Sequence, residues 1–217
     1  GIELIGVSNA RADAEIIHLA RESVRAVGLT PRVEVGNPAF VSALFDAADV
    51  PARSREPLAD AIDRKDVSDV TGLVGSLGLH GRPAAAIVAV PDLYGDAGVL
   101  EAARRLAPSP AATEAVDRLE GVVAEFEDAS ELMLDLAMAR RLSYYTGVTF
   151  RAYTFDFGQP LLGGPLAAAG GCQWRLVYGR AGLPTGRVPR LLCRAPPPAR
   201  GVQGGPRDRR RPGGSRT

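Results

Sequence analysis

The sequence is poor in the residues that most often mark metal and redox sites. Among 217 residues there are two histidines and two cysteines, Cys172 and Cys193, and neither cysteine lies near a histidine or a further cysteine pair. Metal sites need several such ligands at close spacing. We therefore expect incidental thiols, no metal site and no cofactor.

Long apolar runs are also missing. No run approaches the roughly 20 residues that a helix needs to cross a bilayer. The chain does not open with a basic leader, an apolar stretch and a small-residue cleavage site. The sequence thus predicts a cytoplasmic protein without a membrane partner. It opens at Gly1 directly on a strand pattern, which is typical of a fragment or a processed product.

Acidic residues are almost absent from the last part of the chain. Residues 1–164 carry 15 basic and 24 acidic side chains, whereas residues 165–217 carry 11 arginines, 10 glycines, 8 prolines and one acid, Asp208. Such a composition predicts a disordered or non-native tail. The arginine cluster lacks interleaved aromatics and an adjoining basic domain, so we expect no nucleic-acid partner. The abrupt change near residue 164 suggests a shifted reading frame.

Residues 1–164 predict an α+β fold. Strand patterns at 1–6, 32–36, 132–140, 147–155 and 160–164 flank a helical insertion over about 38–129. A first helix follows Asn9 or Asp13 as its cap and stops at Gly28. Prolines 38, 51 and 57 are expected to divide residues 38–79 into two or three helices. We expect an antiparallel sheet interrupted by the insertion, with 132–140 and 147–155 forming a hairpin.

The stretch "RRLSYYTGVTF", residues 140–150, is the most informative for chemistry. A guanidinium from Arg140 or Arg141 beside Tyr144 or Tyr145 suits a carboxylate or phosphate, and Glu3 could hold an ammonium group. Together they would bind a small zwitterion such as an amino acid. The alternative is that these arginine and glutamate side chains pair with each other or with solvent.

The sequence predicts structural roles for the other polar residues. His18 is expected at the surface or boundary of the first helix, and His80 in a turn before a helix. Asp92 and Asp96 have the spacing of turn and cap residues. The alternating charges of "DAIDRKDVSD", residues 60–69, indicate a solvated face. No catalytic triad can be assembled around either histidine.

The segments "GIELIG", "DAEII", "RRLSYYTGVTFRAYT" and "PLLGG", in this order, resemble histidyl-tRNA synthetases and, more closely, their paralogue, the ATP phosphoribosyltransferase regulatory subunit. The resemblance covers about residues 1–164. It implies a class II aminoacyl-tRNA synthetase-like antiparallel sheet with flanking helices, here incomplete. It also implies a histidine pocket formed by Glu3, Arg140, Tyr144 and Tyr145.

Departures from the synthetase pattern favour the regulatory subunit over the synthetase. Arg141 and Ser143 stand where the synthetases carry glycine and aspartate. Activating an amino acid with ATP needs a positioned set of charges around the phosphoryl group. The resemblance therefore implies a non-catalytic regulatory subunit of the first step of histidine biosynthesis. Its implied partner is the short-form ATP phosphoribosyltransferase catalytic subunit, with L-histidine as effector. The alternatives are a histidyl-tRNA synthetase core fragment and an inactive truncated product.

Overall fold

A computed structural model describes residues 7–139, 147–155 and 157–165 of the chain. The described residues belong to one compact unit. The expected strand at 1–6 and nearly all of the tail, including Cys172 and Cys193, lie outside the described residues. The expected division of the chain after residue 164 therefore stays a prediction.

The first helix and strand follow the local signals closely. Helix α1 spans Ala10–Arg25, and the Asn9 side chain caps it by accepting a hydrogen bond of 2.8 Å from the Ala12 amide. Of the two expected caps, Asn9 is thus the one used. Gly28 has a φ of +80°, a conformation that glycine adopts without steric cost, and it ends the helical turn as expected. Strand β1, Arg32–Gly36, follows.

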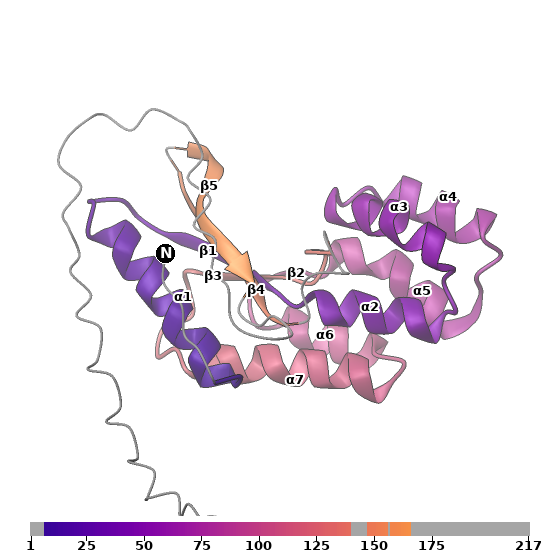
Figure 1. The fold of residues 1–217 in the computed structure, drawn as a ribbon, viewed down its shortest axis with the longest axis horizontal. Coiled ribbons are helices and arrows are strands. Elements are labelled where there is room, and N and C mark those ends of the chain that lie inside the picture. The colour runs from indigo at the N-terminus through magenta and orange to yellow at the C-terminus, as the bar shows by residue number, and fades with distance from the viewer. Residues whose placement is uncertain (1–6, 140–146, 156, 166–217) are drawn as a thin grey trace, which may run out of the picture. The chain divides into compact units, whose positions relative to one another are not determined.

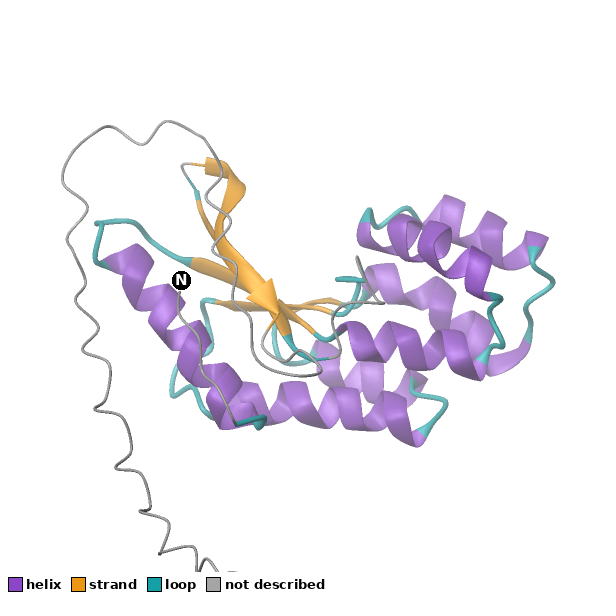
Figure 2. Ribbon diagram, in the orientation of Figure 1, coloured by secondary structure: helices purple, strands orange, loops and turns teal. Residues whose placement is uncertain are grey.

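A block of helices separates β1 from the next long strand, as Figures 1 and 2 show. They are α2 Pro38–Ala47, α3 Ala52–Asp63, α4 Val67–Ser76, α5 Gly81–Ala89, the short η1 Val90–Asp92, α6 Val99–Leu106 and α7 Pro110–Ala124. The break expected at Pro57 was wrong, because Pro57 lies inside α3. A proline removes one helical hydrogen bond, and the buried Leu58 and Ile62 just after it hold the helix in the core.

The sheet has the strand order β2-β3-β1-β4-β5. Its further strands are β2 Tyr94–Gly95, β3 Leu132–Asp135, β4 Thr149–Thr154 and β5 Phe157–Pro165. The α+β class is confirmed, and β1–β4 and β4–β5 are antiparallel as expected. The short β2, which the sequence did not predict, pairs antiparallel with β3. The β1–β3 pair is parallel, so the sheet is mixed. The long helical connection makes this possible, because parallel neighbours need a crossover between them.

The hairpin expected between residues 132–140 and 147–155 was wrong. Strand β1 lies between β3 and β4 and pairs with both. The first of these strands is also shorter than expected, ending at Asp135. The Asp135 carboxylate accepts a hydrogen bond of 3.0 Å from the Ala137 amide, and this local turn competes with continuation of the strand.

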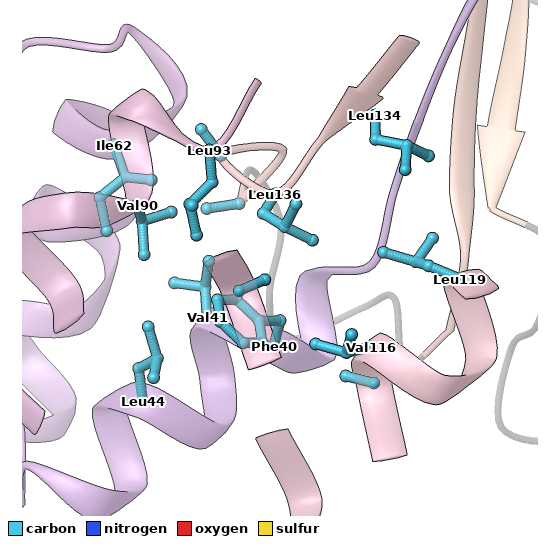
Figure 3. Packing of buried hydrophobic residues seen from close by; sticks show 14 of the residues in the cluster. Phe40, Val41, Leu44, Ile62, Val90, Leu93, Val116, Leu119, Leu134 and Leu136 are labelled. Carbon is cyan, nitrogen blue, oxygen red and sulfur yellow. The ribbon is translucent and has the colours of Figure 1, made fainter. Parts of the chain in front are cut away.

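One hydrophobic core joins the helices to the sheet. Val33 and Val35 of β1, Leu134 of β3 and Phe150 of β4 lie on one face of the sheet and are buried. Helix α1 packs against β1 and β4, and α7 packs against α1 and α2. Figure 3 shows how this core continues from Leu134 past Leu119 of α7 to Phe40 and Val41 of α2. The opposite face of the sheet is left for polar side chains.

Gly36 ends β1 where the chain has no room for a side chain. A Cβ atom at this position would overlap the carbonyl oxygen of Asp135 and approach Met138 Sδ to 3.1 Å. We predict that Gly36→Ala lowers the free energy of unfolding by about 2 kcal/mol, because the backbone of β3 must move. Urea denaturation measures this change.

The matched control is Gly72→Ala in helix α4, where a Cβ atom meets nothing within 4 Å. There the substitution should raise the free energy of unfolding by about 0.5–1 kcal/mol, since alanine favours helix. Equal effects at the two positions would show that Gly36 is not a close-approach site.

A buried ion pair ties α1 to α7. Asp13 Oδ2 accepts a hydrogen bond of 2.7 Å from Arg118 Nε, and only 3% of the Asp13 side chain is exposed. Burial raises the pKa of Asp13, and Arg118 opposes that rise through its hydrogen bond and charge. Removing the cation would leave a buried carboxylate without compensation.

We predict that Arg118→Met lowers the free energy of unfolding by about 2 kcal/mol at pH 7. Without the cation, the Asp13 pKa rises further above its unfolded value. The folded state then binds a proton more readily than the unfolded state, so the penalty should shrink as the pH falls toward 4. Urea denaturation at pH 7 and pH 4 checks this. In an Asp13→Asn/Arg118→Met double variant the penalty should not change between the two pH values, because no carboxyl group is left at position 13 to take up a proton. A penalty that grows at low pH would contradict the assignment.

Candidate functional site

The four residues expected to form a histidine pocket, Glu3, Arg140, Tyr144 and Tyr145, lie outside the described residues. The structure does, however, show where the chain carrying three of them leaves and rejoins the sheet. It leaves the sheet at the end of β3, Asp135, and returns at the start of β4, Thr149. The candidate site is therefore built from the surroundings of these two points.

Three strands bring their ends together at this place. β1 and β3 run parallel, so Gly36 and Asp135 both lie at the carboxyl-terminal edge of their strands. β4 is antiparallel to β1 and starts at the same edge, with Thr149 opposite Gly36. The connection between β3 and β4 thus begins and ends at one edge, which we call the site edge and define by Gly36, Asp135 and Thr149.

Next to the site edge, polar side chains share one face of the sheet. The strand register places Arg32 opposite Tyr153, Glu34 opposite Arg151, and Tyr94 opposite Asp135. Directly opposed residues in a sheet project to the same face. We call this the polar face and define it by those residues: Arg32, Glu34, Tyr94, Asp135, Arg151 and Tyr153.

Lys65 reaches the polar face from the turn after α3. Its Nζ lies 2.6 Å from Asp135 Oδ2 and 4.7 Å from the centre of the Tyr94 ring. The Tyr94 hydroxyl donates a long hydrogen bond of 3.5 Å to Glu34 Oε1. Burial raises the pKa of Tyr94, and the negative charges of Glu34 and Asp135 raise it further. Tyr94 therefore acts as a hydrogen-bond donor at neutral pH.

Arg151 makes a second link between the polar face and α3. Its Nη2 donates a hydrogen bond of 3.2 Å to Asp63 Oδ1. Burial alone would lower the Arg151 pKa, but Asp63 and Tyr153 outweigh it and the pKa is raised. Burial raises the pKa of Tyr153, with Glu34 adding to the rise and Arg151 opposing it. The guanidinium therefore stays charged beside a neutral phenol.

One hydroxyl at the site edge has no hydrogen bond within the described ranges. Thr149 Oγ1 is buried, and no described group satisfies it. Buried hydroxyls normally find a partner. Across the described residues, no cluster of three or more His, Cys, Asp or Glu side chains could hold a metal ion. The polar face offers charges of both signs and phenols, and Thr149 adds a hydroxyl at the site edge, which together suit binding of a polar ligand.

Reasoning from sequence missed the two residues that join α3 to the sheet. The charges of residues 60–69 were expected to be solvated, and this was wrong for Asp63, whose side chain is 9% exposed and pairs with Arg151. Lys65 is exposed as expected, but it also pairs with Asp135 of β3. Local charge alternation carries no information about a distant strand. The alternation in "RVEVG" and "TFRAYT" does place Glu34, Arg151 and Tyr153 on one face, and it is the signal that could have found them.

The residues expected to be structural behave as predicted. His18 is exposed on α1, with its ring 6.3 Å from that of Phe126. His80 lies directly before α5, and its Nδ1 is 2.9 Å from the Gly78 carbonyl oxygen. Asp96 accepts a hydrogen bond from the Gly98 amide in a turn. Among the described helices, none is both long and apolar enough to cross a membrane.

Solved structures share this arrangement of sheet and helices. An ATP phosphoribosyltransferase regulatory subunit/histidyl-tRNA synthetase from Bacillus halodurans matches 75% of this chain and 44% of its own, with a TM-score of 0.69 and 27% identity. The ATP phosphoribosyl transferase (HisG:HisZ) complex from Thermotoga maritima contains a chain that matches 74% of this one and 57% of its own. Its TM-score is 0.58 at 17% identity, which shows a shared fold.

Sequence comparison confirms the resemblance inferred from the motifs. A curated relative from Thermus thermophilus, named ATP phosphoribosyltransferase regulatory subunit, is 40% identical over 164 residues. The match covers 76% of this chain and 45% of the relative, so the chain spans less than half of that protein's length. A family model described as histidyl-tRNA synthetase matches residues 1–165. The chain therefore belongs to the histidyl-tRNA synthetase family, and the curated relative above is a regulatory subunit within it.

Proposed function

We propose that the protein is a regulatory subunit of ATP phosphoribosyltransferase in the first step of histidine biosynthesis. It acts in the cytoplasm, joins a short-form catalytic subunit, activates it and makes it sensitive to histidine. The observation that carries this proposal is the 40% identity over 164 residues with a protein of that name. The Thermotoga complex, which joins HisG and HisZ, supports a catalytic partner.

The proposed effector site is the histidine pocket of Glu3, Arg140, Tyr144 and Tyr145. A carboxylate suits the ammonium group of the amino acid, and a guanidinium fork suits its carboxylate. The tyrosine hydroxyls add hydrogen bonds to the imidazole or carboxylate. The site edge supports this proposal, because the chain that carries Arg140 and both tyrosines starts and ends there.

The proposed subunit does not catalyse aminoacylation. Arg141 and Ser143 replace the glycine and aspartate that the resemblance leads us to expect between the arginine and the tyrosines. A bulky cation in place of glycine and the loss of a carboxylate both change the charges around a reacting phosphoryl group. Histidine binding does not need that reaction and is compatible with both replacements.

We predict that this protein increases phosphoribosyl-ATP formation by a short-form catalytic subunit and that added histidine reverses the increase. Glu3→Gln should raise the half-inhibitory histidine concentration at least about thirtyfold, because the buried ammonium group loses its counter-charge. Steady-state assays with and without histidine measure both effects. Arg105→Gln is the control, since Arg105 forms an exposed pair with Glu101 on α6.

Two outcomes would count against the proposal. Absence of any stimulation would favour an inactive product, and charging of tRNA with histidine would favour the synthetase activity of the family. If the Arg105→Gln control and Glu3→Gln respond equally to histidine, Glu3 is not part of the pocket.

A further inference from the structure

The turn after α3 connects the helices to the site edge through one side chain. Lys65 has a φ of 58°, a left-handed conformation, and its amide donates a hydrogen bond of 2.8 Å to the Ile62 carbonyl oxygen. This conformation is disfavoured for residues other than glycine. It turns the side chain away from the helix and toward β3, where Nζ meets Asp135 Oδ2 at 2.6 Å.

Asp135 uses both of its carboxylate oxygens at the point where β3 ends. Oδ2 accepts from Lys65, and Oδ1 accepts a hydrogen bond of 3.0 Å from the Ala137 amide. Only 4% of the Asp135 side chain is exposed. A buried carboxylate needs an opposite charge and filled hydrogen-bonding positions. The ammonium group of Lys65 therefore holds Asp135 in the orientation that turns the chain out of the sheet.

The segment that follows Asp135 is held by a hydrogen bond and by burial. The Leu136 amide donates a hydrogen bond of 3.0 Å to the Leu93 carbonyl oxygen, and Leu136 is fully buried. Met138 is also buried, against Gly36 of β1. Residues 136–139 thus leave the site edge in a direction fixed by Asp135 on one side and by the core on the other.

We propose that Lys65 is a positioning residue for the histidine site, acting through Asp135 on the chain that leaves β3, so that the helical segment α2–α7 and the site are coupled. This inference rests on the proposed function above. Lys65 is not one of the four proposed histidine ligands. A misplaced supporting residue displaces the groups that depend on it, and ligand affinity falls even when the fold survives.

Arg104 offers a matched control for the loss of an ion pair. It lies in α6 within the same helical segment and pairs with Asp117 at 2.5 Å and with Glu120 at 2.7 Å, both exposed residues of α7. Its side chain is 39% exposed, close to the 37% of Lys65. Arg104→Met and Lys65→Met each remove one half-exposed cation, but only Lys65 pairs with a residue of the site edge.

The experiment compares histidine binding by calorimetry with the urea midpoint of each protein. We expect Lys65→Met to raise the Kd for histidine about tenfold or more, and Lys65→Arg, which keeps the charge, to stay within about threefold of wild type. Asp135→Asn should resemble Lys65→Met. Arg104→Met should bind as wild type, with a smaller midpoint shift than Lys65→Met, because its carboxylates are exposed and Asp135 is buried.

Wild-type affinity in Lys65→Met would overturn the proposal, as would an equal loss in Arg104→Met, which would indicate general destabilisation. If Lys65→Met does not unfold cooperatively, Lys65→Gln replaces it. Glutamine can still donate a hydrogen bond to Asp135, but it carries no charge to hold the carboxylate, so the same weaker binding is expected. A wild-type protein that does not bind histidine would contradict the proposed function itself, and the positioning role with it.

Discussion

The pairing of β1 with both β3 and β4 is the constraint on which the described structure depends. Val33 and Val35 of this strand enter the core, and Glu34 lies on the polar face between Met133 and Arg151. Without β1, the strands on either side would have no ladder joining them, and their ends would not meet at the site edge. Gly36 completes this arrangement, because only a residue without a side chain lets β3 approach so closely.

The two faces of the sheet differ in the chemistry of their side chains. The apolar face packs on α1 and forms one core with α7 and α2, which makes sheet and helices a single unit. On the polar face, Lys65 and Asp63 form ion pairs with Asp135 and Arg151. The carboxylate of each pair is buried while the cation is partly exposed, so removing the cation would leave a buried charge without compensation.

Local signals predicted the elements, whereas partners distant in sequence decided their assembly. Asn9, Gly28 and the patterned strands fixed α1, β1 and β4 because caps and alternation act over a few residues. The β3–β4 hairpin was mispredicted because the intervening β1 is about a hundred residues away in sequence, and closing so long a loop leaves no local trace. The ion pair of Lys65 with Asp135 was missed for the same reason. The pocket residues Glu3, Arg140, Tyr144 and Tyr145 were inferred from residue chemistry and from the resemblance, and they stay a prediction.

If Lys65 positions the histidine site, the helical segment and the site behave as one coupled unit. Hydrogen–deuterium exchange with and without histidine can show this, since each amide reports its own opening. We expect histidine to slow exchange in residues 136–148 and also in the turn after α3, at Lys65 and Asp66, whose amides donate to the carbonyl oxygens of Ile62 and Ala61. Slowing confined to residues 136–148, with the turn unchanged, would contradict the coupling.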